Sequence, residues 1–199
     1  MKYSKNMEEI ALLQPDYLGF IFYEKSPRHL ENSIPILDTN IKKVGVFVNA
    51  SFSAIEEKVM QYNLDLVQLH GDETPEFCAF IETKLVRVIK AFSMDNHFNF
   101  KDLDSYRNCC SYFLFDTKGK HYGGNGTTFT WSILENYHVD KPFFLSGGIG
   151  FENASDLNQF LKKEYAKNCI AIDLNSQFES QAGLKNPVTL KEFINTINQ

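Results

Sequence analysis

The sequence lacks the features that mark membrane, secreted and nucleic-acid-binding proteins. No apolar run approaches the roughly 18 residues of a membrane-spanning helix, and no apolar stretch typical of a secretory signal follows residues 1–6. With 20 basic and 25 acidic residues the formal net charge is −5, so the chain offers no basic footprint for nucleic acid or an anionic membrane. We therefore expect a cytoplasmic protein that binds neither nucleic acid nor membranes.

Cysteine is scarce, and its spacing carries no metal motif. The four cysteines, Cys78, Cys109, Cys110 and Cys169, include no Cys-x-x-Cys pair, and no histidine spacing completes a zinc site. We expect no metal site, and reduced thiols that pack in the core or lie at the surface.

What the chain does contain is a regular alternation of strand-like and helix-like segments. Most strand candidates are near-continuous apolar runs, which is typical of parallel strands covered on both faces. The expected strands are 16–22, 43–48, 64–69, 86–92, 112–115, 143–145 and 169–174. The expected helices are 4–13, 53–62, one starting at 74–77, 153–161 and 187–197.

Three helix starts carry recognisable signals. Ser4 is a candidate N-cap for the first helix, and Ser53 with Glu56 fits a capping box. Thr74 followed by Pro75 predicts the start of the third helix, because proline is favoured at the first helical position.

This alternation predicts an α/β fold with a parallel sheet and right-handed crossovers. The candidates are a doubly wound open sheet and a (β/α)8 barrel. No linker or low-complexity tract interrupts residues 1–199, so we expect a single domain. The chain opens with a helix, which suits neither fold unless a strand lies upstream of Met1; with that strand the fold is a small eight-stranded barrel.

Asp116 is the first candidate for chemistry. It ends the apolar run Tyr112–Phe115, and α/β folds gather their sites at the C-terminal ends of strands. The glycine-rich stretch 119–128 follows. It lacks the Lys-Ser/Thr ending of a P-loop, and its composition favours a loop that closes over a substrate. The alternative interpretation is that Asp116 caps the next segment.

The loops after the last two strands carry residues typical of a phosphate site. Ser146-Gly147-Gly148 follows one strand, and Asn175-Ser176 follows Asp173 at the end of the next. Barrels commonly hold phosphate with backbone N–H groups in these two loops. The alternative is that the glycines merely turn the chain.

Two further candidates follow earlier strands. Arg28 presents a fork suited to a carboxylate or phosphate, although a solvated surface arginine is an equally simple interpretation. His70, followed by Gly71, either faces the site or is a packed or solvated histidine.

Taken in order, these pieces resemble the phosphoribosylanthranilate isomerase family. The matching segments are Asp16–Tyr23 with Ser26-Pro27-Arg28, Val44–Asn49, Val67–Gly71, Phe115–Thr117, Gly123–Gly126 with Phe129 and Trp131, and Leu145–Gly148. The resemblance implies a (β/α)8 TIM barrel of the ribulose-phosphate-binding type over residues 1–199. It also implies an Amadori rearrangement in tryptophan biosynthesis that uses neither metal nor cofactor. The partner would be a small-molecule phosphosugar, and the protein a monomer or homodimer.

The resemblance further implies a role for each candidate. Asp116 would be the acid that protonates the ribose ring oxygen, which requires a carboxyl group able to hold its proton near neutral pH. Arg28 would bind the anthranilate carboxylate. The remaining residues would hold the phosphate or line the site: Gly147, Gly148, Asn175 and Ser176 for the phosphate, His70 and Asp173 for the lining.

Two departures from the family pattern stand out. The family's base is a cysteine at the end of the first strand, in a Cys-Gly-(Ile, Leu or Met) motif, and Met1 aligns with the third position of that motif. We therefore expect this chain to lack the first strand and the base, and to be poorly stable because the barrel is left with open edges. The loop after the last strand also differs, because it reads Asn175-Ser176-Gln177 where the family commonly has small residues and glycine. Two rival functions stay open: another phosphosugar-binding barrel enzyme, and a non-catalytic phosphosugar-binding barrel.

Overall fold

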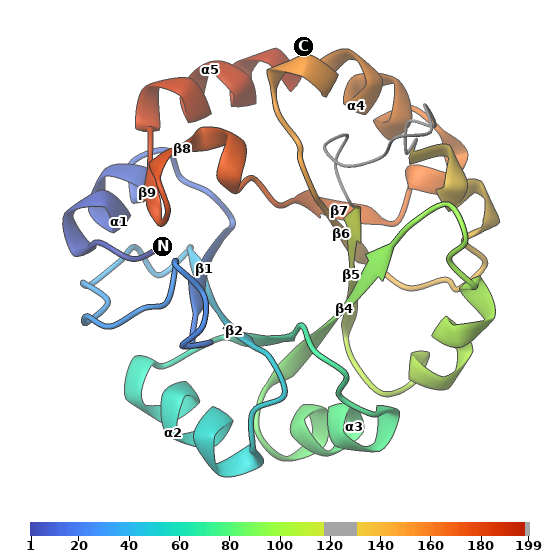
Figure 1. Ribbon diagram of the computed structural model, residues 1–199, viewed down its shortest axis with the longest axis horizontal. Coiled ribbons are helices and arrows are strands. Elements are labelled where there is room, and N and C mark those ends of the chain that lie inside the picture. Colours follow the sequence, from blue (N-terminus) through green and yellow to red (C-terminus); the bar gives the residue numbers. More distant parts are fainter. Residues whose placement is uncertain (118–130, 198–199) are drawn as a thin grey trace.

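Seven parallel strands form one sheet in a computed structural model that describes residues 1–117 and 131–197. They are β1 (Tyr17–Ile21), β2 (Lys42–Phe47), β3 (Leu66–Leu69), β4 (Arg87–Met94), β5 (Tyr112–Thr117), β6 (Phe143–Ser146) and β7 (Cys169–Ile172), paired in sequence order. The sheet curls, and the helices surround its outer side (Figure 1). The predicted parallel α/β sheet is confirmed. The doubly wound alternative is wrong, because the strand order of such a sheet reverses.

The helices occupy the predicted segments. They are α1 (Ser4–Ala11), α2 (Phe52–Tyr62), α3 (Pro75–Lys84), α4 (Ala154–Leu161) and α5 (Pro187–Ile197). Between β4 and β5, and before β6, the described chain forms the 3-10 segments η1 (Phe100–Tyr106) and η2 (Trp131–Asn136) instead of α-helices. Within the described ranges, every helix is too short or too polar to cross a membrane.

Two predicted helix caps are wrong. The Ser4 hydroxyl donates to the Ser33 carbonyl at 3.0 Å, and Tyr3 holds the N-cap position of α1 without a side-chain cap. In α2 the cap is Ser51, whose Oγ accepts from the Ala54 N–H at 3.3 Å. A serine near a helix start has several acceptors and donors within reach, and the path of the preceding chain selects among them. The Thr74–Pro75 start of α3 is confirmed.

The curled sheet has a concave and a convex face, each with its own apolar layer. The convex side packs against the helices, whereas the concave side is filled by a smaller cluster: Val44, Leu66, Ile89, Ala91, Leu114 and Phe144. Side chains alternate along a strand, so residues two positions after this cluster face the same concave side. Gln68, Asp116 and Ser146 are such residues, and they lie toward the C-terminal ends of their strands.

A short hairpin that the sequence pattern did not predict lies near the opening between β1 and β7. It consists of β8 (Glu179–Gln181) and β9 (Leu184–Lys185), and it lies beside α1 (Figure 1). The Asn6 side chain exchanges two hydrogen bonds of 2.8 Å with the backbone of Lys185, which fixes the hairpin to α1. The hairpin therefore brings its side chains to the C-terminal end of the sheet.

Candidate active site

A cavity of about 900 Å3 opens at the C-terminal ends of the strands. Every residue that the sequence singled out as a candidate lines it: Arg28, His70, Asp116, Gly147, Gly148, Asp173, Asn175 and Ser176. The cavity also extends through the opening between β1 and β7 to α1 and α5. The glycine-rich stretch 119–128 lies outside the described residues.

Asp116 lies at the end of β5 beside His70, which follows β3. The Oδ2 of Asp116 is 3.4 Å from the Nε2 of His70, and both side chains are about one-third exposed. The other ring nitrogen of His70, Nδ1, is 2.6 Å from the Nε2 of Gln68, a side chain that is buried. Gln68, His70 and Asp116 thus form a continuous polar row on the concave face.

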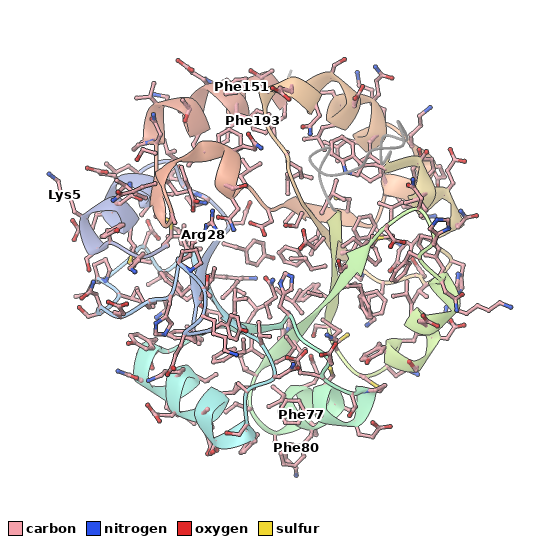
Figure 2. The ribbon with its side chains drawn as sticks, viewed as in Figure 1. Lys5, Arg28, Phe77, Phe80, Phe151 and Phe193 are labelled. Carbon is pink, nitrogen blue, oxygen red and sulfur yellow. The ribbon has the colours of Figure 1, made fainter. Side chains whose placement is uncertain are left out.

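Arg28 is bound by a carboxylate rather than by solvent. Its Nε donates to both Glu179 oxygens, at 2.8 and 3.0 Å, and its Nη2 donates at 2.6 Å. Arg28 lies inside the ring of helices near β1 and the hairpin, whereas Lys5 on α1 points outward (Figure 2). The fork geometry holds the guanidinium at the cavity wall in one orientation.

Lys185 is a second cation on the same carboxylate. Its Nζ lies 3.0 Å from Glu179 Oε1 and 2.6 Å from the Oδ1 of Asn175. Burial lowers the pKa of Lys185, partly offset by Glu179. Burial by itself would raise the pKa of Glu179, but the hydrogen bonds from Arg28 and Lys185 outweigh it and hold that pKa below its usual range. The cluster is therefore a paired set of charges with two cations on one carboxylate.

Asp173 faces this cluster from the end of β7. Burial raises its pKa above the ordinary 3.8, and the hydroxyl of Ser146, which donates to Asp173 Oδ2 at 3.1 Å, offsets only part of that rise. Among the described cavity residues, Asp116 and Asp173 are thus carboxyl groups at the C-terminal strand ends in unlike surroundings. Pairs of this kind are typical of acid–base sites.

The loop after β6 requires glycine at two consecutive positions. Gly147 has φ 102° and Gly148 has φ 62°, in the left-handed region that side chains with a Cβ rarely adopt. Backbone N–H groups in such turns form concave anion-binding sites. The loop faces Asn175 and Ser176 in the same cavity.

The four cysteines, all within the described ranges, lie away from the cavity lining. Burial raises the pKa of Cys78, Cys110 and Cys169 to about 12, so these thiols stay protonated at neutral pH. Among the described residues, histidine, cysteine and carboxylate side chains form no group of three that could hold a metal ion.

Three site residues were missed from the sequence. Gln68 had a usable signal, because it is the polar member of an otherwise apolar strand. Glu179 and Lys185 had none, since they belong to a short hairpin without strand-like periodicity, and the contact of Glu179 with Arg28 spans about three-quarters of the chain.

Replacement of Asp173 with asparagine is expected to stabilise the protein at neutral pH. Because the folded pKa is raised above 3.8, the unfolded chain loses this proton first as the pH rises, and the native protein loses stability through that range. Asparagine carries no charge and still accepts from Ser146. Urea unfolding should show a higher midpoint than the wild type at pH 7, and the gain should shrink as the pH falls through 3.8. An equal difference at every pH would contradict the raised pKa.

Comparison with known proteins identifies relatives over the whole chain. A family model described as N-(5'phosphoribosyl)anthranilate (PRA) isomerase matches residues 2–196. The N-(5'-phosphoribosyl)anthranilate isomerase of Parabacteroides distasonis is 42% identical over 203 residues, which cover 99% of this chain and 90% of the relative.

Solved structures agree with this similarity. The crystal structure of phosphoribosyl anthranilate isomerase from Thermotoga maritima has a TM-score of 0.80 at 30% identity, covering 100% of this chain and 95% of that one. A crystal structure of phosphoribosyl anthranilate isomerase in complex with reduced 1-(o-carboxyphenylamino)-1-deoxyribulose 5-phosphate has a TM-score of 0.79 at 27% identity, with the same coverage.

Proposed function

The chain belongs to the N-(5'-phosphoribosyl)anthranilate isomerase family, and from this we propose that its cavity carries out the family's reaction. The substrate N-(5'-phosphoribosyl)anthranilate opens its furanose ring and becomes 1-(2-carboxyphenylamino)-1-deoxyribulose 5-phosphate, in tryptophan biosynthesis. The observation that carries the proposal is Asp116 at the end of β5, paired with His70 and facing the glycine loop after β6 in one cavity. We further propose that residues 1–199 act as one domain.

Asp116 is the general acid. It donates a proton to the ring oxygen, the bond between that oxygen and C1 breaks, and the nitrogen lone pair forms the C1–N double bond. A base then removes the proton from C2, and the electron pair moves to give an enol, which tautomerises to the ketone. The Nε2 of His70 lies 3.4 Å from Asp116 Oδ2 and stabilises the carboxylate left after proton donation.

The substrate is held at its two ends. The phosphate lies at the loop of Gly147 and Gly148 and at Asn175 and Ser176, where backbone N–H groups and short polar side chains converge. Arg28 binds the anthranilate carboxylate. Within the described residues Glu179 engages Nε and Nη2 of Arg28, which leaves Nη1 for a second carboxylate. Asp173 lines the ribose part of the cavity.

We propose that the fold is a (β/α)8 barrel whose first strand is absent from this chain. The opening between β1 and β7 is lined by apolar side chains of both walls, among them Leu18, Ile172 and Ile194. The nitrogen of Met1 donates to the Gly19 carbonyl of β1 at 2.6 Å, so the backbone there already runs along the free edge of β1. A further parallel strand in this opening would close the sheet and, through the family's Cys-Gly motif, supply the base.

One observation favours a second candidate function. None of the four cysteines, which all belong to the described part of the chain, lines the cavity, and burial raises the pKa values of the Cys78, Cys110 and Cys169 thiols. A phosphosugar-binding barrel without turnover would fit that arrangement.

The test follows loss of the substrate's anthranilate fluorescence in two proteins. One is the chain itself, and the other carries a family-type first strand that ends in Cys-Gly directly before Met1. We expect turnover only in the second protein, because only there does a thiol reach C2. A matched control ends the added strand in Ser-Gly, which closes the barrel without the base.

The other outcomes separate the proposals. Turnover in both proteins would show that the base is a residue within 1–199. Binding of a phosphorylated product analogue by both proteins, without turnover in either, would support the binding barrel. Turnover of the Ser-Gly control at the rate of the Cys-Gly protein would refute the role of the thiol.

A further inference from the structure

Gln68 lines the cavity, and among the described residues its side-chain amide pairs with the imidazole of His70. Its amide nitrogen is 2.6 Å from Nδ1 of the ring, and its side chain is 7% exposed. Gln68 and His70 are two positions apart on β3 and its extension, so both point to the concave face. A buried amide at this distance restricts the orientation of the imidazole ring.

The neighbours of the ring determine which atom of the amide faces Nδ1. A neutral imidazole carries one N–H and one acceptor nitrogen. The other nitrogen, Nε2, faces Asp116 Oδ2 at 3.4 Å, and a carboxylate oxygen requires a donor there. Nδ1 of the neutral ring must then accept, so the amide of Gln68 donates. The opposite amide orientation would place a lone pair of Nε2 against the carboxylate.

We propose that Gln68 is a positioning residue that fixes His70 as the tautomer with its proton on Nε2, and thereby fixes which oxygen of Asp116 carries the acidic proton. Because the N–H on Nε2 of His70 then faces Oδ2 of Asp116 at 3.4 Å, the proton of the neutral acid resides on Oδ1, which is left to face the substrate. The catalytic part of this inference rests on the proposed isomerase activity; the tautomer does not.

Gln68 also opposes protonation of the ring. An imidazolium carries N–H groups on both nitrogens, and the donating amide would then face a donor. Removing the amide therefore makes a protonated ring easier to form.

The first measurement is the imidazole nitrogen spectrum of the 199-residue chain labelled with 15N-histidine at pH 8. The chain has five histidines, and His70→Asn identifies the signals of His70. We expect a hydrogen-bonded acceptor shift at Nδ1 and a protonated shift at Nε2. A protonated Nδ1 in the neutral ring would overturn the inference.

Variants of Gln68 test the cause. In Gln68→Met the Nδ1 signal should move toward that of an acceptor without a partner, and the midpoint of His70 protonation should rise. In Gln68→Glu the carboxylate accepts from Nδ1, and the midpoint should rise further than in Gln68→Met. Gln61→Met, at an exposed position on α2, is the matched control and should leave the spectrum unchanged. An unchanged His70 signal in both Gln68 variants would overturn the role of the amide.

Turnover provides the second readout, in the strand-completed protein. Gln68→Met should lower kcat roughly tenfold to a hundredfold, as with other partners that orient a functional imidazole, and leave KM nearly unchanged. The acidic limb of its pH profile should move to higher pH together with the His70 midpoint. A raised KM at unchanged kcat would contradict the positioning role. If the strand-completed wild type is itself inactive, the proposed function fails, while the nitrogen spectrum still decides the tautomer.

Discussion

Replacing Asp116 with asparagine is expected to lower kcat of the strand-completed protein by roughly a hundredfold to ten-thousandfold, the range for loss of a general acid. Asparagine has the same shape as aspartate, so the 3.4 Å contact with His70 Nε2 has a counterpart in the variant. What is lost is the transferable proton. The measurement is the initial rate of fluorescence loss at saturating substrate.

The protein offers a matched control for this variant. Asp104 accepts from Nε2 of His138 at 3.1 Å, and both side chains are about half exposed, away from the cavity. Asp104→Asn removes the same kind of pair and should leave kcat unchanged. If Asp116→Asn kept more than about a tenth of the wild-type kcat, another group would be the acid, since general acids contribute at least about a hundredfold.

Replacing Lys90 with methionine is expected to destabilise the fold by about 3–5 kcal/mol, the usual effect of leaving one partner of a buried ion pair uncompensated. Lys90 Nζ is 3.0 Å from Glu73 Oε2, and both side chains are 3% exposed. For a chain of this size that loss corresponds to a fall in Tm of roughly 6–20 °C. Urea and thermal unfolding measure it directly.

The reason for so large an effect is that the pair also holds the loop that follows His70. Lys90 Nζ donates to the Gly71 carbonyl at 2.7 Å, and Glu73 accepts from the N–H groups of Gly71 and Asn49 at 2.9 Å. Without the ammonium, the carboxylate is left buried with only these donors.

Two further variants of the pair separate charge from packing. The double variant Glu73→Gln with Lys90→Met should recover much of the lost stability, because no lone charge remains buried. Lys167→Met is the control, since the Lys167–Glu164 pair of 3.1 Å lies at the surface, and it should leave the midpoint unchanged. A Lys90→Met variant with the wild-type midpoint would show that the pair is not a net support of the fold.

The sequence could predict those parts of the fold that depend on neighbouring residues. The apolar runs that become β1 to β7 are recognisable in the chain because each parallel strand is covered on both faces and needs no polar side. The position of Asp116 at a strand end, and of the glycines after β6, follows from the same runs. Each of these sequence signals is local, so it predicts the strand and its end independently of how distant segments pack.

Local signals failed where a side chain had several partners to choose from. Ser4 bonds to the carbonyl of Ser33, 29 residues away, instead of capping its own helix. Ser51 caps α2 although Ser53 and Glu56 have the capping-box spacing. In both cases the sequence places a serine hydroxyl at the N-terminal end of the helix. The path of the chain before the helix then decides which group that hydroxyl bonds to.

By itself the sequence determined the parallel α/β architecture, the strand ends that meet at one edge, and the residues gathered there. Only the tertiary structure decided how those residues are paired. Arg28 pairs with Glu179, which lies 151 positions further along the chain. Lys185 reaches Asn175 because the backbone of Lys185 is bound by Asn6, 179 positions earlier, which fixes the hairpin to α1. Strand periodicity is set by the alternation of the chain's own backbone, whereas ion pairs and imidazole tautomers are set by whichever groups the curled sheet brings within hydrogen-bonding distance.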